Sequence, residues 1–223
     1  ERRALGCDRD GAYLNVVLRT RARPDDLPRL FGEVAELHAG HPSRWTVADT
    51  VPTDDLEKGL IGAGYAMGHV HDAQVVDVAG FRPRHSAIEV RRVVDEQTLR
   101  DCWEVKDAAF GPTERSEADV ALELAACAAE SASVQRFVAY LEGGPVCSGG
   151  INLYPHLEFG LLWGGGTVPH ARGRGAYLAT VNARLERAAQ RSIPVVGLYA
   201  RAETSSPIVT RLGFEACGRM TYF

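Results

Sequence analysis

The chain has 223 residues, of which 45% are apolar and 24% charged, as is ordinary for a globular protein of one or two domains. Its formal net charge of −4 provides no overall basic field for nucleic acid, and no apolar run is long enough to span a membrane, so we expect neither partner. The five cysteines are scattered without a C-x-x-C pair, which favours reduced thiols in a cytoplasmic protein over a disulfide framework or a zinc knuckle.

The first 80 residues alternate segments of strand and helix character. Pro24-Asp25-Asp26 opens an amphipathic helix, and Gly62-Ala63-Gly64 closes a second one. The predicted order is strand, helix, strand, helix, strand, over residues 12–18, 25–38, 45–47, 53–62 and 74–78. A polar segment with glycine and proline, residues 80–86, follows. We therefore predict a smaller α/β region over residues 1–80 and a second domain over residues 86–223.

The second region begins with a strand and two helices and continues with a run of strands. Asp95 can cap the first helix, Gly111-Pro112 ends it, and Gly143-Gly144 predicts a tight hairpin. Strands are predicted over residues 88–94, 135–141, 146–153, 158–168 and 195–200, with a last strand towards residue 223. Helices are predicted over residues 95–110, 116–130, 177–191 and 206–212.

The clearest chemical signal lies between a predicted strand and a long helix, in Thr167-Val168-Pro169-His170-Ala171-Arg172-Gly173-Arg174-Gly175-Ala176-Tyr177. Glycines let main-chain N–H groups approach a ligand closely, and the N-terminus of a helix favours an anion. Arg172 and Arg174 would add full charges and planar donor groups. The segment therefore predicts a phosphate or pyrophosphate site, and a tight turn with two solvated arginines is the alternative interpretation.

Other ligand patterns are weak. No G-x-x-x-x-G-K-[ST] segment is present, which excludes the common nucleotide triphosphatase loop. Gly62-Ala63-Gly64 follows a helix rather than a strand and lacks the spacing of a dinucleotide loop. His69 and His71 have no third ligand at a suitable spacing, so no metal is expected.

The order of motifs in the second region resembles the GNAT superfamily of acyl-CoA-dependent N-acyltransferases. The signature Gln/Arg-x-x-Gly-x-Gly/Ala is matched by Arg172-Gly173-Arg174-Gly175-Ala176-Tyr177, with Pro169 three residues before it and Gly213-Phe214 near the end of the chain. The resemblance covers roughly residues 88–223. It implies an α/β (α+β) fold, a mixed and mostly antiparallel sheet flanked by helices. Two positions depart from the family: Tyr177 replaces a small residue, and Val209 stands where a tyrosine often protonates the leaving thiolate.

The resemblance also implies acetyl-CoA as co-substrate. In the family, the strand before the phosphate loop diverges from the next strand, and the pantetheine arm lies between them. Here the end of the strand over residues 158–168 would offer main-chain groups to pantetheine, and Gly164-Gly165-Gly166 suits a bulge. The residues expected to bind the cofactor are Gly166, Thr167, Val168, Arg172, Gly173, Arg174, Gly175, Ala176, Tyr177 and Ser205.

Direct attack of an amine on a thioester needs a base, a donor for the oxyanion and a proton for the thiolate. A main-chain N–H at the end of the same strand can serve the oxyanion. Glu158 is the predicted base, acting through water, with His156 as the alternative. Tyr199 is the predicted acid, with Ser205 or Ser206 as alternatives. Each also has a plain interpretation as a solvated residue or, for the serines, a helix cap.

The function predicted from these features is an N-acetyltransferase for a primary amine of a small molecule or peptide. The acidic net charge mildly favours a cationic amine. A non-catalytic acyl-CoA-binding sensor or scaffold is the alternative, supported by Val209.

The role of the first 80 residues has two interpretations. They lack a second Arg-x-x-Gly-x-Gly loop, but Leu60-x-x-x-Gly64-Tyr65 loosely resembles a reduced GNAT half. One interpretation is therefore a tandem protein whose first half is degenerate, and the other is an unrelated cap. The oligomeric state stays open, with a homodimer among the options.

Overall fold

The structure is a computed structural model that describes residues 2–6, 15–50, 54–83 and 86–223. The chain divides into two compact units, one made of Glu1–Gln74 together with Tyr199–Phe223 and the other of Val75–Leu198. This division differs from the predicted one in two respects. The glycine- and proline-containing segment 80–86 lies inside the second unit, and the segment 199–223, expected to complete the second domain, packs with the first unit.

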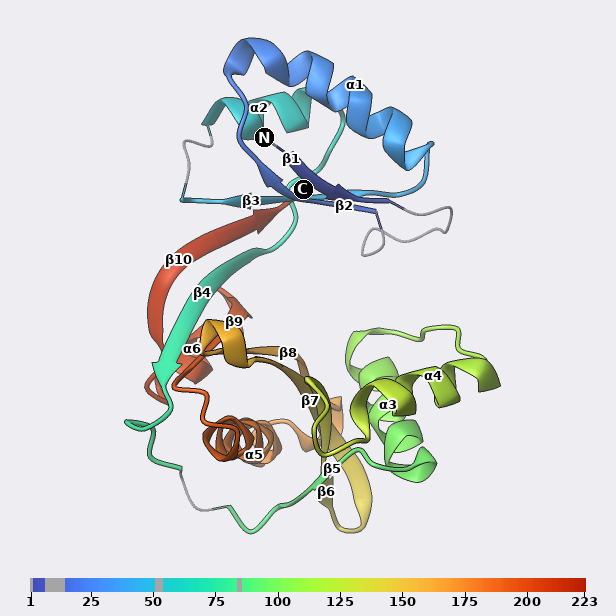
Figure 1. Ribbon diagram of the computed structural model, residues 1–223, viewed down its shortest axis with the longest axis vertical. Helices are drawn as coiled ribbons and strands as arrows, with labels where there is room; N and C mark the ends of the chain where they lie inside the picture. Colours follow the sequence, from blue (N-terminus) through green and yellow to red (C-terminus); the bar gives the residue numbers. More distant parts are fainter. Residues whose placement is uncertain (1, 7–14, 51–53, 84–85) are drawn as a thin grey trace. The chain divides into compact units, whose positions relative to one another are not determined.

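The first unit is a sheet with α1 and α2 on one face (Figure 1). Its strand order is β1-β2-β3-β10-β4, with β2 and β3 parallel and the pairs β1/β2 and β3/β10 antiparallel. The strands are β1 (Arg2–Leu5), β2 (Val16–Thr20), β3 (Arg44–Ala48), β4 (Val70–Asp77) and β10 (Glu215–Tyr222). The helices are η1 (Pro24–Asp26), α1 (Leu27–His38), α2 (Asp54–Gly62) and α6 (Ser206–Thr210).

The core of this unit follows the periodicity that predicted α1. Leu27, Leu30 and Val34 are buried at helical spacing and pack with the fully buried Trp45 of β3. The predicted helices and strands of the first region are found, and β1 is an additional strand that the sequence did not reveal. Residues 12–14 of the first predicted strand and residue 53, the first of the second predicted helix, lie outside the described residues.

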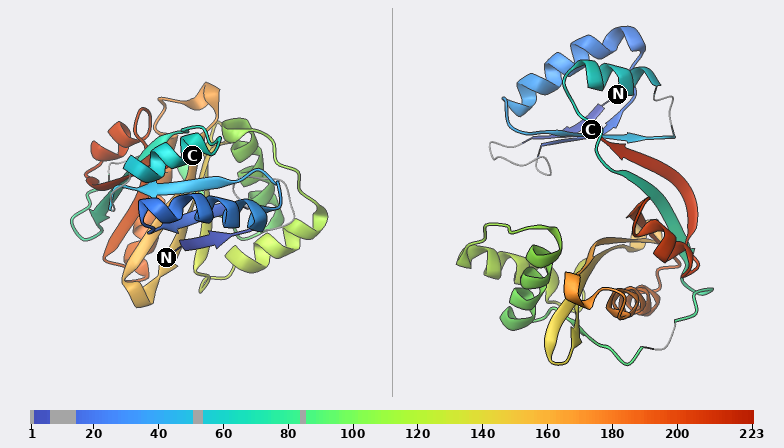
Figure 2. Two further views of the ribbon diagram at one scale, coloured as in Figure 1. Left: turned by 90° about the horizontal axis from the view of Figure 1, so that it is seen from above. Right: turned by 180° about the vertical axis from the view of Figure 1, so that it is seen from behind.

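The second unit contains a mostly antiparallel sheet between two layers of helix. Its strand order is β9-β8-β7-β6-β5, and only β8 and β9 are parallel among these pairs. Figures 1 and 2 show α3 and α4 on one face and α5 on the other. The strands are β5 (Glu89–Arg92), β6 (Val134–Leu141), β7 (Gly144–Tyr154), β8 (Phe159–Thr167) and β9 (Val195–Arg201). The division between the units falls within two strands: β9 passes into the first unit at Tyr199, and β4 passes into the second at Val75. The helices are α3 (Glu96–Phe110), α4 (Glu117–Cys127), η2 (Pro155–Leu157), η3 (Pro169–Ala171) and α5 (Ala176–Gln190). The predicted fold class is therefore confirmed.

The hairpin between β6 and β7 forms where the sequence predicted it. Glu142 and Gly143 have φ of 54° and 83°, the left-handed pair that a tight hairpin turn requires. Only the second of these positions carries glycine, so Glu142 adopts a conformation that is unfavourable for a side chain. The turn places the Glu142 carboxylate beside the glycine-rich segment before α5, where it pairs with Arg174.

The capping box of α3 provides a test of local stability. The main-chain N–H of Thr98 donates to Asp95 Oδ1 at 2.9 Å, as the sequence predicted for this cap. Replacing Asp95 by alanine is expected to lower the free energy of unfolding by about 1 kcal/mol, because an N–H of the first turn loses its acceptor. Chemical denaturation measures the loss. Asp95→Asn keeps an acceptor and should stay close to wild type, and equal losses in both variants would contradict the capping role.

Candidate functional site

The edge of β8 is unpaired over its second half. Pairing between β8 and β9 runs from Phe159 opposite Val195 to Leu162 opposite Leu198 and then stops, while β8 continues to Thr167 on β7 alone. Among the described residues, no strand pairs with this edge of β8 beyond Leu162. Apart from the Thr167 carbonyl, which accepts from Arg172, the main-chain N–H and C=O groups of residues 163–167 that point away from β7 are therefore open to a ligand. This is the divergence that the GNAT resemblance implied.

A bulge interrupts β8 in the same stretch. Ser148 pairs with Gly166 and Gly150 with Trp163, so Gly164 and Gly165 together oppose the single residue Gly149. Gly164 has φ of 58°, which favours glycine. The sequence suggested a bulge at these glycines, and the structure has one there.

The segment after β8 presents the N-terminus of α5. Gly173 and Gly175 have φ of 77° and 88°, so both glycines occupy left-handed positions. Gly175 is the N-cap of α5 and has no side chain to cap the helix, and the first turn carries no carboxylate. The first N–H groups of this 15-residue helix and its positive end are therefore available to an anion.

The two arginines of the turn differ in their partners. Arg172 is exposed and donates from Nε to the Thr167 carbonyl at 3.3 Å, which folds its side chain back over the end of β8. Arg174 pairs with Glu142 at 2.5 Å, and this arginine lowers the pKa of the Glu142 carboxyl. A phosphate would compete with Glu142 for Arg174, whereas the terminal nitrogens of Arg172 make no hydrogen bond to the residues that the structure describes. Arg172 is therefore the readier anion-binding group.

Three of the residues predicted to bind the cofactor take part in the packing or the main-chain hydrogen bonds of the turn. The Val168 N–H donates to the Val146 carbonyl at 2.9 Å, and its own carbonyl accepts from Ala171 N–H at 3.1 Å. Val168 therefore shapes the turn but has no free N–H for pantetheine, unlike the expectation. Ala176 is buried in the core beside Val168. Tyr177 packs on the bulge, because a Cβ at Gly165 would lie 2.8 Å from its Cε2. The glycine at position 165 thus makes room for the large residue that departs from the family signature.

A buried arginine supports the bulge from the α5 side. Arg184 is 1% exposed and donates from Nε to the Thr180 carbonyl at 3.0 Å and from Nη1 to the Gly150 carbonyl at 3.2 Å. A Cβ at Gly149 would lie 2.8 Å from Nη1, so the guanidinium needs glycine there. Burial lowers the pKa of Arg184. No motif singled out this arginine, although a charged residue on the buried face of a helix is a visible signal.

The predicted base lies away from the bulge. Glu158 is exposed, has φ of 50° and follows η2 directly. It precedes Leu162, the last residue of β8 that pairs with β9, by four positions, or about 13 Å along an extended strand. One bridging water does not span that distance. His156, the alternative base, lies on the same exposed turn.

The predicted acids belong to the first unit, and the glycine turn belongs to the second. Tyr199 is 50% exposed at the end of β9, and Ser205 is the N-cap of α6 without a side-chain hydrogen bond. Ser206 is engaged, because its hydroxyl donates to Asp72 at 2.6 Å. Val209 is fully buried and offers no proton. The roles of Tyr199 and Ser205 stay predictions.

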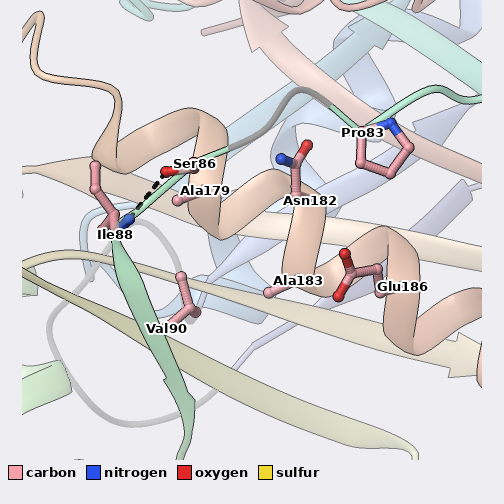
Figure 3. Close-up of a pocket in the computed structure, with 8 residues that line it drawn as sticks. All are labelled: Pro83, Ser86, Ile88, Val90, Ala179, Asn182, Ala183 and Glu186. Atoms are coloured by element: carbon pink, nitrogen blue, oxygen red, sulfur yellow. Dashed lines mark hydrogen bonds between the residues drawn. The ribbon is translucent and has the colours of Figure 1, made fainter.

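A cavity of about 520 Å³ lies between α5, β5 and the segment before β5 (Figure 3). Figure 3 shows the residues that line it, with Asn182 and Glu186 of α5 on the side of Pro83, Val90 on β5 and Ile88 just before that strand. Among the described residues, its lining includes one carboxylate and no arginine or lysine. The described lining therefore offers no positive charge to the phosphates of CoA, in contrast to the turn before α5.

Neither a metal site nor a helix that could cross a membrane is found in the part of the chain that the structure describes. No group of three or more His, Cys, Asp or Glu residues is arranged to hold a metal ion there. Within the same ranges, none of the helices combines the length and the apolar character needed to cross a membrane.

Comparison of the fold with solved structures identifies similar proteins. A GCN5-related N-acetyltransferase from Sphaerobacter thermophilus has a TM-score of 0.73 at 17% identity, over 99% of this chain and 74% of that one. A GCN5-related N-acetyltransferase from Kribbella flavida has a TM-score of 0.69 at 14% identity, over 96% and 82%. A tandem GNAT protein of the clavulanic acid biosynthesis pathway has a TM-score of 0.57 at 13% identity, over 93% and 74%.

Sequence comparison alone finds less. No protein-family model matches the chain, and no curated protein matches it. The similarity therefore lies in the arrangement of the strands and helices over most of the chain. By that arrangement, the chain has the fold of the GNAT superfamily.

Proposed function

We propose that the protein is an acetyl-CoA-dependent N-acetyltransferase that acts on a primary amine of a small molecule or peptide. The observation that carries this proposal is the free edge of β8, which leads directly to the uncapped N-terminus of α5. A long, flexible arm that ends in a pyrophosphate matches this combination of a strand edge and an anion site.

The chain's residues fit acetyl-CoA in three respects. Arg172 and the first N–H groups of α5 would hold the pyrophosphate, with Arg174 joining when it leaves Glu142. The edge over residues 163–167 would pair with the amide groups of pantetheine. Main-chain N–H groups at the bulge would polarise the thioester carbonyl. When bound, acetyl-CoA supplies the activated acetyl group.

The alternative function is a non-catalytic acyl-CoA sensor or scaffold, and the buried Val209 favours it. A domain of this kind would keep the phosphate turn and the strand edge but lack a proton donor at the usual place. The first unit would then be a degenerate GNAT half or a cap, since it carries no second glycine turn.

Two measurements on one preparation separate these functions. Calorimetric titration with acetyl-CoA and with free CoA tests the binding site. Incubation with a panel of amines, read by mass spectrometry of acetylated products, tests turnover. Mass detection is preferable to a thiol reagent, because the free thiol of Cys217 is exposed. Binding with turnover supports the enzyme, binding without turnover on any amine favours the sensor, and absence of binding contradicts both.

A further inference from the structure

A lysine occupies the sheet-facing side of α3. Leu99, Cys102 and Trp103 are buried on this helix, and Lys106 follows at positions i+7, i+4 and i+3 from them. Lys106 is only partly exposed. The sequence contains two lysines against 23 arginines, and the other lysine is the exposed Lys58 of α2. A lysine on this face therefore departs from the apolar pattern of the helix, and it departs from the preference of this chain for arginine over lysine.

Lys106 lies in a cluster of charges that do not balance. Arg115 forms a two-bond pair with Asp107, with both distances 2.8 Å. Arg136 pairs with Glu123 at 2.6 Å. Lys106 has no carboxylate within ion-pair distance among the described residues, so three cations face two carboxylates. Burial lowers the pKa of the Lys106 ammonium, and the nearby charge of Arg136 lowers it further.

Strand register places this cluster beside the free edge of β8. Arg136 of β6, Gly150 of β7 and Trp163 of β8 form one row across the sheet. Because Gly150 has no side chain, the indole of Trp163 lies over β7 and meets the Arg136 guanidinium 5.0 Å from its ring centre. Trp163 Nε1–H donates to Asn152 at 2.7 Å, which fixes the ring.

The end of α3 lies over the bulge itself. A Cβ at Gly166 would be 2.7 Å from the ring of Phe110, one turn after Lys106. Phe110 is 61% exposed, and Trp163 and Lys106 keep part of their surface open. The unpaired ammonium therefore lies beside the place where a thioester on the β8 edge would meet an acceptor.

We propose that this face of the second unit binds an amine acceptor that also carries a carboxylate, and that the Lys106 ammonium pairs with that carboxylate. The proposal rests on the proposed acetyltransferase function and names its class of substrate. One carboxylate balances the single excess positive charge of the cluster, and Trp163 and Phe110 offer apolar contact to the rest of the molecule. The local charge thus points to an acceptor different from the cationic amine that the net charge of the chain favours.

The test uses the small number of lysines. Protein labelled with ¹³C and ¹⁵N in lysine gives two sets of side-chain NMR signals, from Lys58 and Lys106. The probes are the N-acetyl derivatives of the protein amino acids with uncharged side chains, each beside its neutral C-terminal amide, titrated with and without CoA. We expect at least one carboxylate probe to shift the Lys106 signals to saturation, with no shift from its amide and none at Lys58.

Turnover gives a second readout once an acceptor is found. Lys106→Met should lower kcat/KM for the carboxylate-bearing acceptor about ten- to one-hundred-fold, the range of a charge-assisted hydrogen bond, and leave the Kd for acetyl-CoA unchanged. Lys106→Arg keeps the charge and should retain most of the activity.

Several results would overturn the proposal. The first is that no probe shifts the Lys106 signals, and the second is that acid and amide shift them equally. The third is that mass spectrometry finds Lys106 itself acetylated. Binding of acetyl-CoA without any response at Lys106 would remove this subsite and leave the acetyltransferase proposal standing. A response at Lys106 in a protein that does not bind CoA would support the subsite and remove the acetyltransferase proposal.

Discussion

Replacing Arg172 by alanine is expected to weaken the binding of acetyl-CoA and of free CoA about ten- to one-hundred-fold, the range of one charge-assisted hydrogen bond. Arg172 carries the larger share because no described residue bonds to its terminal nitrogens, whereas Arg174 is held by Glu142. Arg174→Ala should therefore cost less than Arg172→Ala. Calorimetry at two salt concentrations measures the effect, and the wild-type advantage should shrink at high salt.

Two further variants make this prediction specific. Glu142→Gln should tighten CoA binding, because it releases Arg174 and removes a negative charge beside the phosphate turn. Arg82→Ala removes an exposed arginine elsewhere in the second unit and should change nothing. Dephospho-CoA tests which phosphate is bound, since the loss in Arg172→Ala should persist with this ligand if Arg172 binds the pyrophosphate. Equal losses in the Arg82 and Arg172 variants would show that the turn is not the anion site.

The helices, the hairpin between β6 and β7 and the glycine turn before α5 were predictable because their signals are local. The Asp95 cap, the Gly143 turn and the left-handed glycines at 173 and 175 each follow from the conformation that one residue type permits. Strand β1 was not predictable, because Arg2–Leu5 is short and gains its structure only by pairing with β2.

The divergence of β8 from β9 depends on contacts between distant segments. Nothing in residues 159–167 or 195–201 states that their pairing stops after Leu162, and only the family resemblance implied it. The same reason explains why the sequence grouped the segment 199–223 with the second region: its packing with the first unit follows from the pairing of β10 with β3.

The candidate site was partly readable from sequence. The residues of the turn were found, but Glu158 was chosen for its place near a strand start, and the structure shows that this is the end of β8 remote from the bulge. The row formed by Arg136, Gly150 and Trp163 needed the register of three strands. Lys106, by contrast, could have been singled out as a charged residue on the apolar face of a predicted helix, but it was missed.

Replacing Gly150 by alanine is expected to lower the free energy of unfolding by about 1–3 kcal/mol, as is usual for overpacking. A Cβ there would lie 2.2 Å from the Trp163 indole, so the ring must leave its place and lose both its hydrogen bond to Asn152 and its contact with Arg136. Chemical denaturation measures the stability. Because the chain has three tryptophans, the fluorescence change that is absent in a Trp163→Leu background reports the environment of this ring. The same displacement should raise KM for the acceptor more than the Kd for acetyl-CoA.

A control and a rescue test the cause. Gly144→Ala lies in the same strand, and its Cβ would approach only the Leu141 carbonyl at 3.8 Å, so it should be nearly neutral. Replacing Trp163 by leucine removes the obstacle, and in that background Gly150→Ala should cost much less than in wild type. The coupling energy of this double-mutant cycle measures the contact between the two positions. Additive effects would mean that the main chain of β7 itself requires glycine at position 150. The proposed acceptor site would then not depend on the row formed by Arg136, Gly150 and Trp163.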